Sequence, residues 1–230
     1  DEIGGFVLKR LAKSISYPLS LLYHNIVTHG IWPNCWKIHH ACPLFKKKSR
    51  FDPDNYRLIH LVPIVSKVLE RVMQTPLSRF FEEANVLLDS QFAFRKSHGT
   101  KDLLALEFAK WIRALNRREK IGLYLSDVTG AFDHVDTSKL MSKLENRGIR
   151  GKALLLFKSY LVGRRLAVVV NGEKSEALEI SNSVYQGVVF GPTLWNIFFQ
   201  EVSIPVHNNG CEAFQYADDN TVLVFILVRL

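Results

Sequence analysis

Two stretches decide the fold: residues 121–133 read IGLYLSDVTGAFD, and residues 213–228 read AFQYADDNTVLVFILV. The first predicts a strand over 121–128, with Asp127 at its end. The second predicts strands over 213–217 and 221–228, joined by a turn at Asp218-Asp219-Asn220. Because neighbouring strands lie about 4.8 Å apart, carboxylates at their ends can share a pair of metal ions. The pattern therefore favours two-metal phosphoryl or nucleotidyl transfer, although Asp-Asp-Asn is also ordinary turn chemistry.

The residues between these two stretches alternate helices and strands. Helical spacing covers 137–147 and 152–161, and alternation predicts a hairpin of 165–170 and 177–183 that turns at Asn171-Gly172. Gly191-Pro192 then opens another helix. The order strand, helices, two strands, helix, two strands predicts an α+β fold whose sheet is a split βαββαβ layer, antiparallel with helices on one face.

The first half of the chain is predicted to be mainly helical. Apolar spacing over 6–29 indicates two helices, of which Pro18 starts the second. A strand follows over 36–45, and 62–88 reads as two consecutive helices separated at Pro76. A further amphipathic helix covers 101–116.

Composition and charge set the outer limits. The 230 residues are 47% hydrophobic and 23% charged, which excludes wholesale disorder, and the longest apolar run, 222–228, is too short for a membrane span. Residues 1–115 carry 17 basic and 10 acidic side chains, against 13 and 12 in residues 116–230. This bias suggests a lobe that grips a polyanion, although a solvated basic surface explains it as well. The chain opens at Asp1 and stops just after a strand, so we expect a piece of a longer reading frame.

Several blocks of the sequence, taken together and in this order, resemble the reverse transcriptases of non-LTR (LINE-like, jockey-type) retrotransposons. The metal-binding blocks are Asp127 to Asp136 and Tyr216-Ala217-Asp218-Asp219. The other blocks are Trp36-Lys37 with Pro43-Leu44-Phe45-Lys46-Lys47, Asn55-Tyr56-Arg57, Ser66-Lys67-Val68-Leu69-Glu70, Gln91-Phe92-Ala93-Phe94-Arg95-Lys96, Tyr185-Gln186-Gly187, and Phe190-Gly191-Pro192-Thr193-Leu194.

The resemblance implies a right-hand polymerase with fingers and palm. It implies an N-terminal helical extension over 1–35, mainly fingers over 36–118 and mainly palm over 119–230, with the thumb placed after Leu230 and so absent from this piece. The implied activity is RNA-directed DNA polymerisation, a nucleotidyl transfer from deoxynucleoside triphosphates to a primer 3′-hydroxyl on an RNA template. Two Mg²⁺ ions, with Mn²⁺ as the alternative, are the implied cofactors, and cytoplasm and nucleus are the implied compartments.

The resemblance also assigns site residues. Asp127, Asp218 and Asp219 match the catalytic carboxylates, and the metal-binding set is these three with Val128. The implied nucleotide-binding positions are Lys46, Lys47, Arg57, Thr129, Gly130, Ala131, Phe132, Gln186 and Gly187. Among these, Phe132 matches the aromatic that excludes a 2′-hydroxyl. The expected contacts to template or primer are Arg95, Lys96, Tyr216, Arg164 and Arg165. For Arg164 and Arg165 this follows from their place at the opening of a hairpin, and a solvated pair explains them nearly as well.

Departures from the family pattern leave one rival open. Ala93, Tyr185 and Val188 stand where the family usually has Gly, Pro and Ser. The alternative is therefore a decayed or repurposed fingers and palm that binds nucleic acid without polymerising. Another two-metal enzyme such as a nuclease has no use for a triphosphate cradle or an aromatic gate. A zinc site at Cys35, His39, His40 and Cys42 is disfavoured by its ligand spacing.

Overall fold

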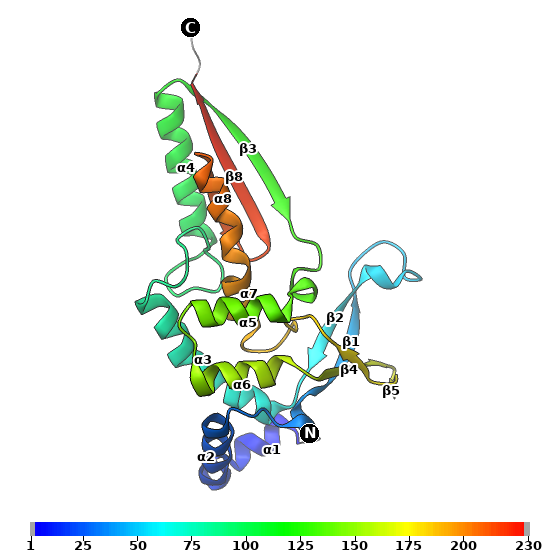
Figure 1. The fold of residues 1–230 in the computed structure, drawn as a ribbon. Coiled ribbons are helices and arrows are strands. Elements are labelled where there is room, and N and C mark those ends of the chain that lie inside the picture. Colours follow the sequence, from blue (N-terminus) through cyan, green and yellow to red (C-terminus); the bar gives the residue numbers. More distant parts are fainter. Residues whose placement is uncertain (1–2, 228–230) are drawn as a thin grey trace. The chain divides into compact units, whose positions relative to one another are not determined.

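The computed structural model describes residues 3–227, and the chain divides into two compact units, each drawn from two separate stretches of sequence (Figure 1). Unit 1 consists of Asp1–Ser78 and Phe132–Gly191, and unit 2 of Arg79–Ala131 and Pro192–Leu230. Both contain helices and strands, as the α+β prediction requires. The division into fingers over 36–118 and palm over 119–230 stays a prediction.

The sheet of unit 1 is centred on β1 (Ile38–Phe45) and β4 (Arg164–Val170), which pair in parallel. β2 (Tyr56–Leu61) is antiparallel to β1, while β5 (Glu173–Lys174) and β6 (Leu178–Ile180) are antiparallel to β4. The predicted turn at Asn171-Gly172 is confirmed, since both residues have positive φ (51° and 87°), as a tight two-residue hairpin requires.

Helices form the rest of unit 1. They are α1 (Gly5–Arg10), α2 (Ala12–His29), the first part of α3 (Ile64–Glu83), α5 (Thr137–Asn146) and α6 (Gly151–Leu161), with short 3-10 turns at Asn34–Trp36, Pro53–Asn55 and Ala131–His134. Trp32, Tyr160 and Phe190 meet in the core, with ring centroids 4.8 Å apart for Trp32–Tyr160 and 5.3 Å apart for Tyr160–Phe190. An aromatic cluster thus joins segments that are far apart in the sequence.

Unit 2 is built on a three-stranded antiparallel sheet in the order β3 (Glu119–Asp127), β8 (Asp219–Leu227), β7 (Glu212–Tyr216). Helix α4 (Thr100–Asn116), labelled in Figure 1, packs against β3, and α8 (Ser203–Asn208) packs against β7. The other helices are α7 (Gly191–Phe199) and a 3-10 turn at Gln200–Val202. Val228, predicted to end the last strand, lies outside the described residues.

Two details of the predicted fold are wrong. The 165–170 hairpin does not join the strands of 121–128 and 213–228 in one layer, because residues Arg165–Val168 pair with Ile38–Ala41 instead. Pro18 and Pro76 were expected at helix boundaries, but both lie inside helices, α2 and α3. A proline costs an interior helical hydrogen bond, so packing of the apolar helix faces has outweighed that loss.

Within residues 3–227, no helix combines the length and the apolar character that a bilayer crossing needs.

Candidate functional site

The three predicted carboxylates lie together at one end of the sheet of unit 2. Asp127 is the last residue of β3 and pairs directly with Asp219, the first residue of β8. Directly opposed residues of an antiparallel pair place their Cβ atoms about 5 Å apart on the same face. Tyr216 is the next residue in this row, since it pairs with Asp219 from the other side. The pairing of strand ends brings Asp127 and Asp219 together, as the sequence predicted.

The hairpin turn differs from its prediction. It consists of Ala217 and Asp218 alone, and Asp219 and Asn220 already belong to β8. Ala217 has a φ of +58°, in the left-handed region that residues with a Cβ seldom adopt. The shift from the predicted Asp218-Asp219-Asn220 turn follows from this residue, because one left-handed residue lets the chain reverse in two residues.

The carboxylates at this end of the sheet repel one another. The pKa of Asp219 is raised, first by burial and then by repulsion from Asp218 and Asp127. Carboxylate oxygens are the ligands that Mg²⁺ prefers, and a divalent cation would relieve this repulsion. In the part of the chain that the structure describes, no three His, Cys, Asp or Glu side chains are gathered into a ready-made metal cage. The donor chemistry fits a divalent ion, but the ligands are not closed around one point.

The residues after β3 continue the predicted site within unit 2. Val128, Thr129, Gly130 and Ala131 follow Asp127 directly. Gly130 has a φ of +65°, which a glycine adopts without strain, and Ala131 is buried. Small residues at this bend leave its backbone open to close approach by a ligand.

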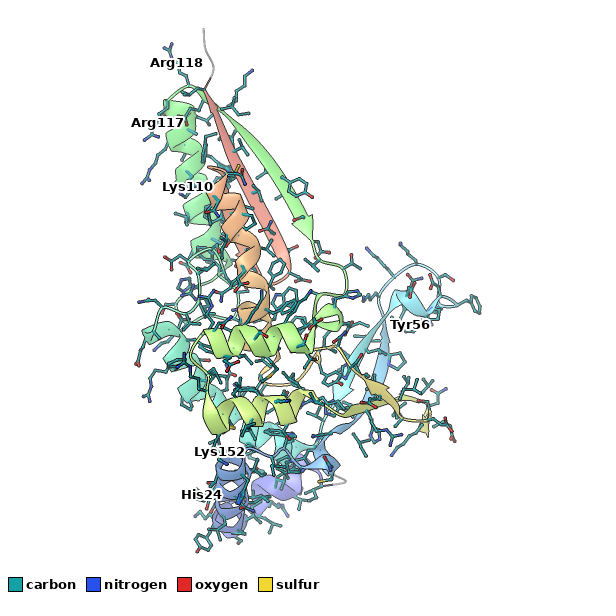
Figure 2. The ribbon with its side chains drawn as sticks, viewed as in Figure 1. His24, Tyr56, Lys110, Arg117, Arg118 and Lys152 are labelled. Carbon is teal, nitrogen blue, oxygen red and sulfur yellow. The ribbon has the colours of Figure 1, made fainter. Side chains whose placement is uncertain are left out.

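The remaining nucleotide-binding candidates lie in unit 1. Lys46 and Lys47 follow β1 and are exposed, as is Arg57 on β2, so the three cations share one hairpin. Lys46 lies near Asp133. The pKa of Asp133 is raised overall, because the effect of burial outweighs the opposing effects of His134 and Lys46. Tyr56, labelled in Figure 2, starts β2 on the same hairpin.

Phe132, Gln186 and Gly187 also belong to unit 1. Phe132 is half-buried, and its carbonyl oxygen accepts a hydrogen bond from the backbone N–H of Val184 at 2.8 Å. His60 of β2 donates its backbone N–H to the carbonyl of Gln186 at 3.2 Å. Gly187 has a φ of +99°, and a Cβ there would lie 3.2 Å from the carbonyl oxygen of His60. The turn at Gln186-Gly187 is therefore fastened to β2 and needs its glycine.

The five predicted template and primer contacts differ in exposure. Lys96 and Arg165 are exposed, and Tyr216 is half-buried. Arg95 is engaged inside unit 2, with a two-point ion pair to Glu82 (Nε–Oε1 3.1 Å, Nη2–Oε2 2.8 Å) and a bond to the Leu88 carbonyl. Lys96 is thus the member of that pair that a phosphate can reach.

Arg164 is the clearest departure. Its side chain is interior, with the residue 2% exposed, and its Nε donates to the Tyr160 carbonyl. Its guanidinium carbon lies 3.8 Å from the Tyr160 ring centroid and 4.8 Å from that of Tyr185. This position argues against contact with a nucleic-acid backbone, because the guanidinium is buried and contacts Tyr160 and Tyr185 in the core of unit 1. Arg164 and Arg165 are neighbours in β4, so they point to opposite faces of the sheet, but the sequence does not say which of them points inward. The pairing of β4 with β1 decides this.

Sequence reasoning passed over the residues that hold the predicted loops in place. Glu70 of α3 is 1% exposed, and its Oε2 accepts the backbone N–H groups of Val189 (2.7 Å) and Phe190 (3.2 Å). Burial raises the pKa of Glu70, while these N–H groups, Arg164 and Tyr160 lower it. Glu70 and Gln91 both stand in quoted motif blocks, but nothing in a single sequence says which loop they contact.

Basic side chains that the sequence did not single out gather where α4 meets β3. Figure 2 labels Lys110 on α4 and Arg117 and Arg118 at the turn that follows it. Arg117 and Arg118 are exposed, whereas Lys110 pairs with Glu212 of β7 at 2.6 Å. Of the three labelled cations, the two arginines are thus available to a polyanion.

Comparisons with known proteins identify the family. Residues 45–225 match the family described as reverse transcriptase (RNA-dependent DNA polymerase). The RNA-directed DNA polymerase from the mobile element jockey of Drosophila melanogaster is 32% identical over 216 residues, which cover 89% of this chain and 23% of the relative. The probable RNA-directed DNA polymerase from transposon BS of the same species is 28% identical over 97% of this chain and 24% of its own length.

A solved structure shares the fold at low identity. Apo telomerase from Candida tropicalis, truncated from its C-terminal domain, superposes with a TM-score of 0.61 at 10% identity, covering 91% of this chain and 49% of that one. The chain spans about a quarter of the length of the curated relatives it matches. Since the family match extends over most of the sequence and includes Asp127, Asp218 and Asp219, the chain belongs to the reverse transcriptase (RNA-dependent DNA polymerase) family.

Proposed function

We propose that this chain is the catalytic part of an RNA-directed DNA polymerase that extends a DNA primer on an RNA template. The observation that carries the proposal is the direct pairing of Asp127 with Asp219, next to Asp218 in the turn. The 3′-oxygen of the primer would form a bond to the α-phosphorus of a deoxynucleoside triphosphate, and pyrophosphate would leave. We further propose that the protein acts in the cytoplasm and nucleus.

The carboxylates have one role in this reaction. Asp127, Asp218 and Asp219, with Val128 beside them, would hold two Mg²⁺ ions, or Mn²⁺ in their place. Bound divalent ions supply activation of the primer hydroxyl and stabilisation of the charge on the leaving pyrophosphate. The protein's part would be to keep three like charges close together at one end of the sheet, where the pKa of Asp219 is raised first by burial and then by repulsion from Asp218 and Asp127.

Other residues would bind and select the nucleotide. Backbone N–H groups at Thr129, Gly130 and Ala131 suit triphosphate oxygens, since small residues allow close approach. The exposed cations Lys46, Lys47 and Arg57 suit the charge that develops on the phosphates.

The sugar and the template strand would meet a second set. Phe132 would exclude a 2′-hydroxyl by its ring, and Gln186-Gly187 would pack on the template base. Lys96, Arg165 and Tyr216 remain the candidates for strand contacts. Lys96 and Arg165 are exposed, although Arg165 also donates to the Ala177 carbonyl at 2.8 Å, whereas the guanidinium groups of Arg95 and Arg164 are engaged within their own units.

The second candidate is a fold that binds nucleic acid but does not polymerise. The departures at Ala93 and Tyr185 favour it, and both side chains are buried in tightly packed places. Tyr185 has the rings of His39 and His60 at 4.7 Å and 4.6 Å, so the exchange for proline has been accommodated by packing. Accommodation of this kind keeps the loop ordered, which is compatible with activity.

Primer extension separates the two candidates. The full-length protein is given an oligo(dT) primer on poly(rA), dTTP and Mg²⁺, and is compared with Asp127→Ala and with Asp89→Ala, an exposed aspartate of the same unit. We expect extension by the wild type and Asp89→Ala, and none by Asp127→Ala, while all three bind the duplex. Extension by Asp127→Ala at the wild-type rate contradicts the two-metal assignment. Binding by the wild type without extension selects the second candidate.

A further inference from the structure

Ala217, which precedes Asp218 in the hairpin turn, is held in an unfavourable backbone conformation. Ala217 has a φ of +58°, and a residue with a Cβ populates this left-handed region only when its surroundings hold it there. The two carboxylates that follow, Asp218 and Asp219, take their direction from this residue. What holds Ala217 therefore also aims the carboxylates.

Gln91 contacts both backbone groups of Ala217. Its Oε1 accepts the Ala217 N–H at 3.1 Å, and its Nε2 donates to the Ala217 carbonyl oxygen at 3.3 Å. The indole N–H of Trp195 donates to the same carbonyl at 2.9 Å. The amide of Gln91 thus offers Ala217 the donor and acceptor that a neighbouring strand would offer.

Gln91 is itself fixed. It is fully buried, and its Oε1 also accepts the Ala93 N–H at 2.9 Å. The backbone on either side is bonded to Gln215 of β7, with Phe92 N–H to Gln215 O at 2.9 Å and Gln215 N–H to Ser90 O at 2.7 Å. A side chain attached to such a segment has little freedom to follow a moving turn, so it can hold the turn in one conformation.

We propose that Gln91 is a positioning residue of the polymerase, which holds Ala217 in the left-handed conformation so that Asp218 and Asp219 face Asp127. The effect on rate rests on the proposed function, whereas the effect on the turn does not. Trp195 shares the carbonyl contact. Every contact in this argument lies within unit 2.

The first experiment compares two buried glutamines of unit 2. Gln91→Leu removes the contacts to Ala217, and Gln200→Leu removes a buried amide of equal exposure that bonds instead to the Leu88 N–H at 2.8 Å. Hydrogen exchange of the Ala217 amide should accelerate at least tenfold in Gln91→Leu and stay unchanged in Gln200→Leu. Primer extension by the full-length protein should lose about 100-fold in kcat with an unchanged KM for dTTP in Gln91→Leu alone, since misplacement by about 1 Å has such an effect.

Rescue provides the second experiment. Ala217→Gly removes the Cβ that makes the left-handed conformation unfavourable, so the turn should need Gln91 less. Added to Gln91→Leu, it should restore at least tenfold of the lost kcat.

The outcomes are separable. Equal exchange at the Ala217 amide in Gln91→Leu and Gln200→Leu overturns the positioning role, as does a kcat loss that Ala217→Gly fails to relieve. If the wild type does not extend primers, the proposed function has failed, and the exchange measurement still decides whether Gln91 holds the turn.

Discussion

The turn at Ala217-Asp218 in unit 2 and the 183–190 loop in unit 1 are both irregular segments of the candidate site, yet they are held by opposite chemistry. Neutral groups, the amide of Gln91 and the indole of Trp195, hold the turn. A buried carboxylate, Glu70, holds the loop through the N–H groups of Val189 and Phe190. The interior guanidinium of Arg164 stacks on Tyr185 at the other end of the loop.

The difference follows from what each segment carries. The turn presents Asp218 beside Asp127 and Asp219, and these charges already repel one another. A charged anchor near them would shift their pKa values further and compete for the metal, so neutral anchors suit this place. The 183–190 loop carries no ionisable side chain except Tyr185, and a buried anion there disturbs no carboxylate of the site. The contrast shows that the charge state of an anchor follows the charge of the segment it holds.

The largest change in stability is expected from Glu70→Ala, which removes the charged anchor of the 183–190 loop. The change leaves two backbone N–H groups without an acceptor and the buried Arg164 without its counter-charge, which should lower the free energy of unfolding by about 3 kcal/mol. Urea unfolding of the wild type and the variant measures the difference.

Glu70→Gln is the matched control, because its amide oxygen can still accept both N–H groups. It should lose less than half as much stability as Glu70→Ala. If the two variants lose the same amount, the negative charge and not the hydrogen bonding of Glu70 stabilises the loop.

The pH dependence of stability should also distinguish the charged anchor. Burial raises the pKa of Glu70 above its ordinary 4.5, so the folded state keeps the proton over a range in which the unfolded state has lost it. In that range stability falls as pH rises, by about 1.4 kcal/mol per pH unit, because the unfolded state binds fewer protons. The stability is fully present below pH 4.5 and is lost as pH rises through the raised pKa.

The measurement is the difference in unfolding free energy between the wild type and Glu70→Gln from pH 4 to pH 8. His39 and His60, whose pKa values burial lowers to about 3 and about 4, titrate in both proteins and cancel from the difference. A difference that stays flat over this range would show that Glu70 is ionised in folded and unfolded protein alike.

The sequence predicted the exposed residues of the candidate site but not the buried residues that hold them in place. Asp127 and Asp219 were found because strand ends and turns leave local signatures, and their pairing follows from two strands lying side by side. Helices over 101–116, 137–147 and 152–161 were found because apolar spacing of three and four residues is a local pattern, and α4, α5 and α6 match them within one or two residues.

The rest depended on long-range packing. The tie from Glu70 to Val189 spans 119 positions and the tie from Gln91 to Ala217 spans 126, so no local pattern announces either. The same is true of β4, whose alternation predicted a strand but not its parallel partner β1. Proline gave a misleading local signal at Pro18 and Pro76, because tertiary packing kept α2 and α3 continuous.

A third, smaller effect is expected on sugar selection, from a substitution beside the 183–190 loop. The Phe132 carbonyl is bonded to Val184, the second residue of the 183–190 loop, and its ring lies 3.5 Å from where a Cβ on Gly191 would stand. If the ring is the wall against a 2′-hydroxyl, Phe132→Val should shift the ratio of ribonucleotide to deoxyribonucleotide kcat/KM upward about tenfold.

Phe157→Val is the control for Phe132→Val, since Phe157 is a buried aromatic of unit 1 that packs on Phe190 at 5.3 Å. It should lower stability and leave the ratio unchanged. A ratio that moves equally in both variants would assign sugar selection to general packing of unit 1 and remove Phe132 from the site.

The smallest effect on stability is expected from Asp218→Asn. This change tests the turn that is held by neutral groups. The pKa of Asp219 is raised first by burial and then by repulsion from Asp218 and Asp127, so without a divalent cation the turn is less stable than its hydrogen bonds would make it. Removing one of the like charges should raise the free energy of unfolding by a few tenths of a kcal/mol at low salt and pH 7, because exposed charges are strongly screened. Asp89→Asn, at an exposed position of the same unit, should leave the free energy of unfolding unchanged.

Addition of Mg²⁺ should reverse the order of stability of the two proteins, since the wild type then gains stability and Asp218→Asn gains less. The measurement is a pair of thermal melts with and without Mg²⁺ at two salt concentrations. A loss of stability in Asp218→Asn without the ion would mean that this carboxylate supports the turn itself, and the idea that neutral anchors offset a repulsive cluster would have to be given up.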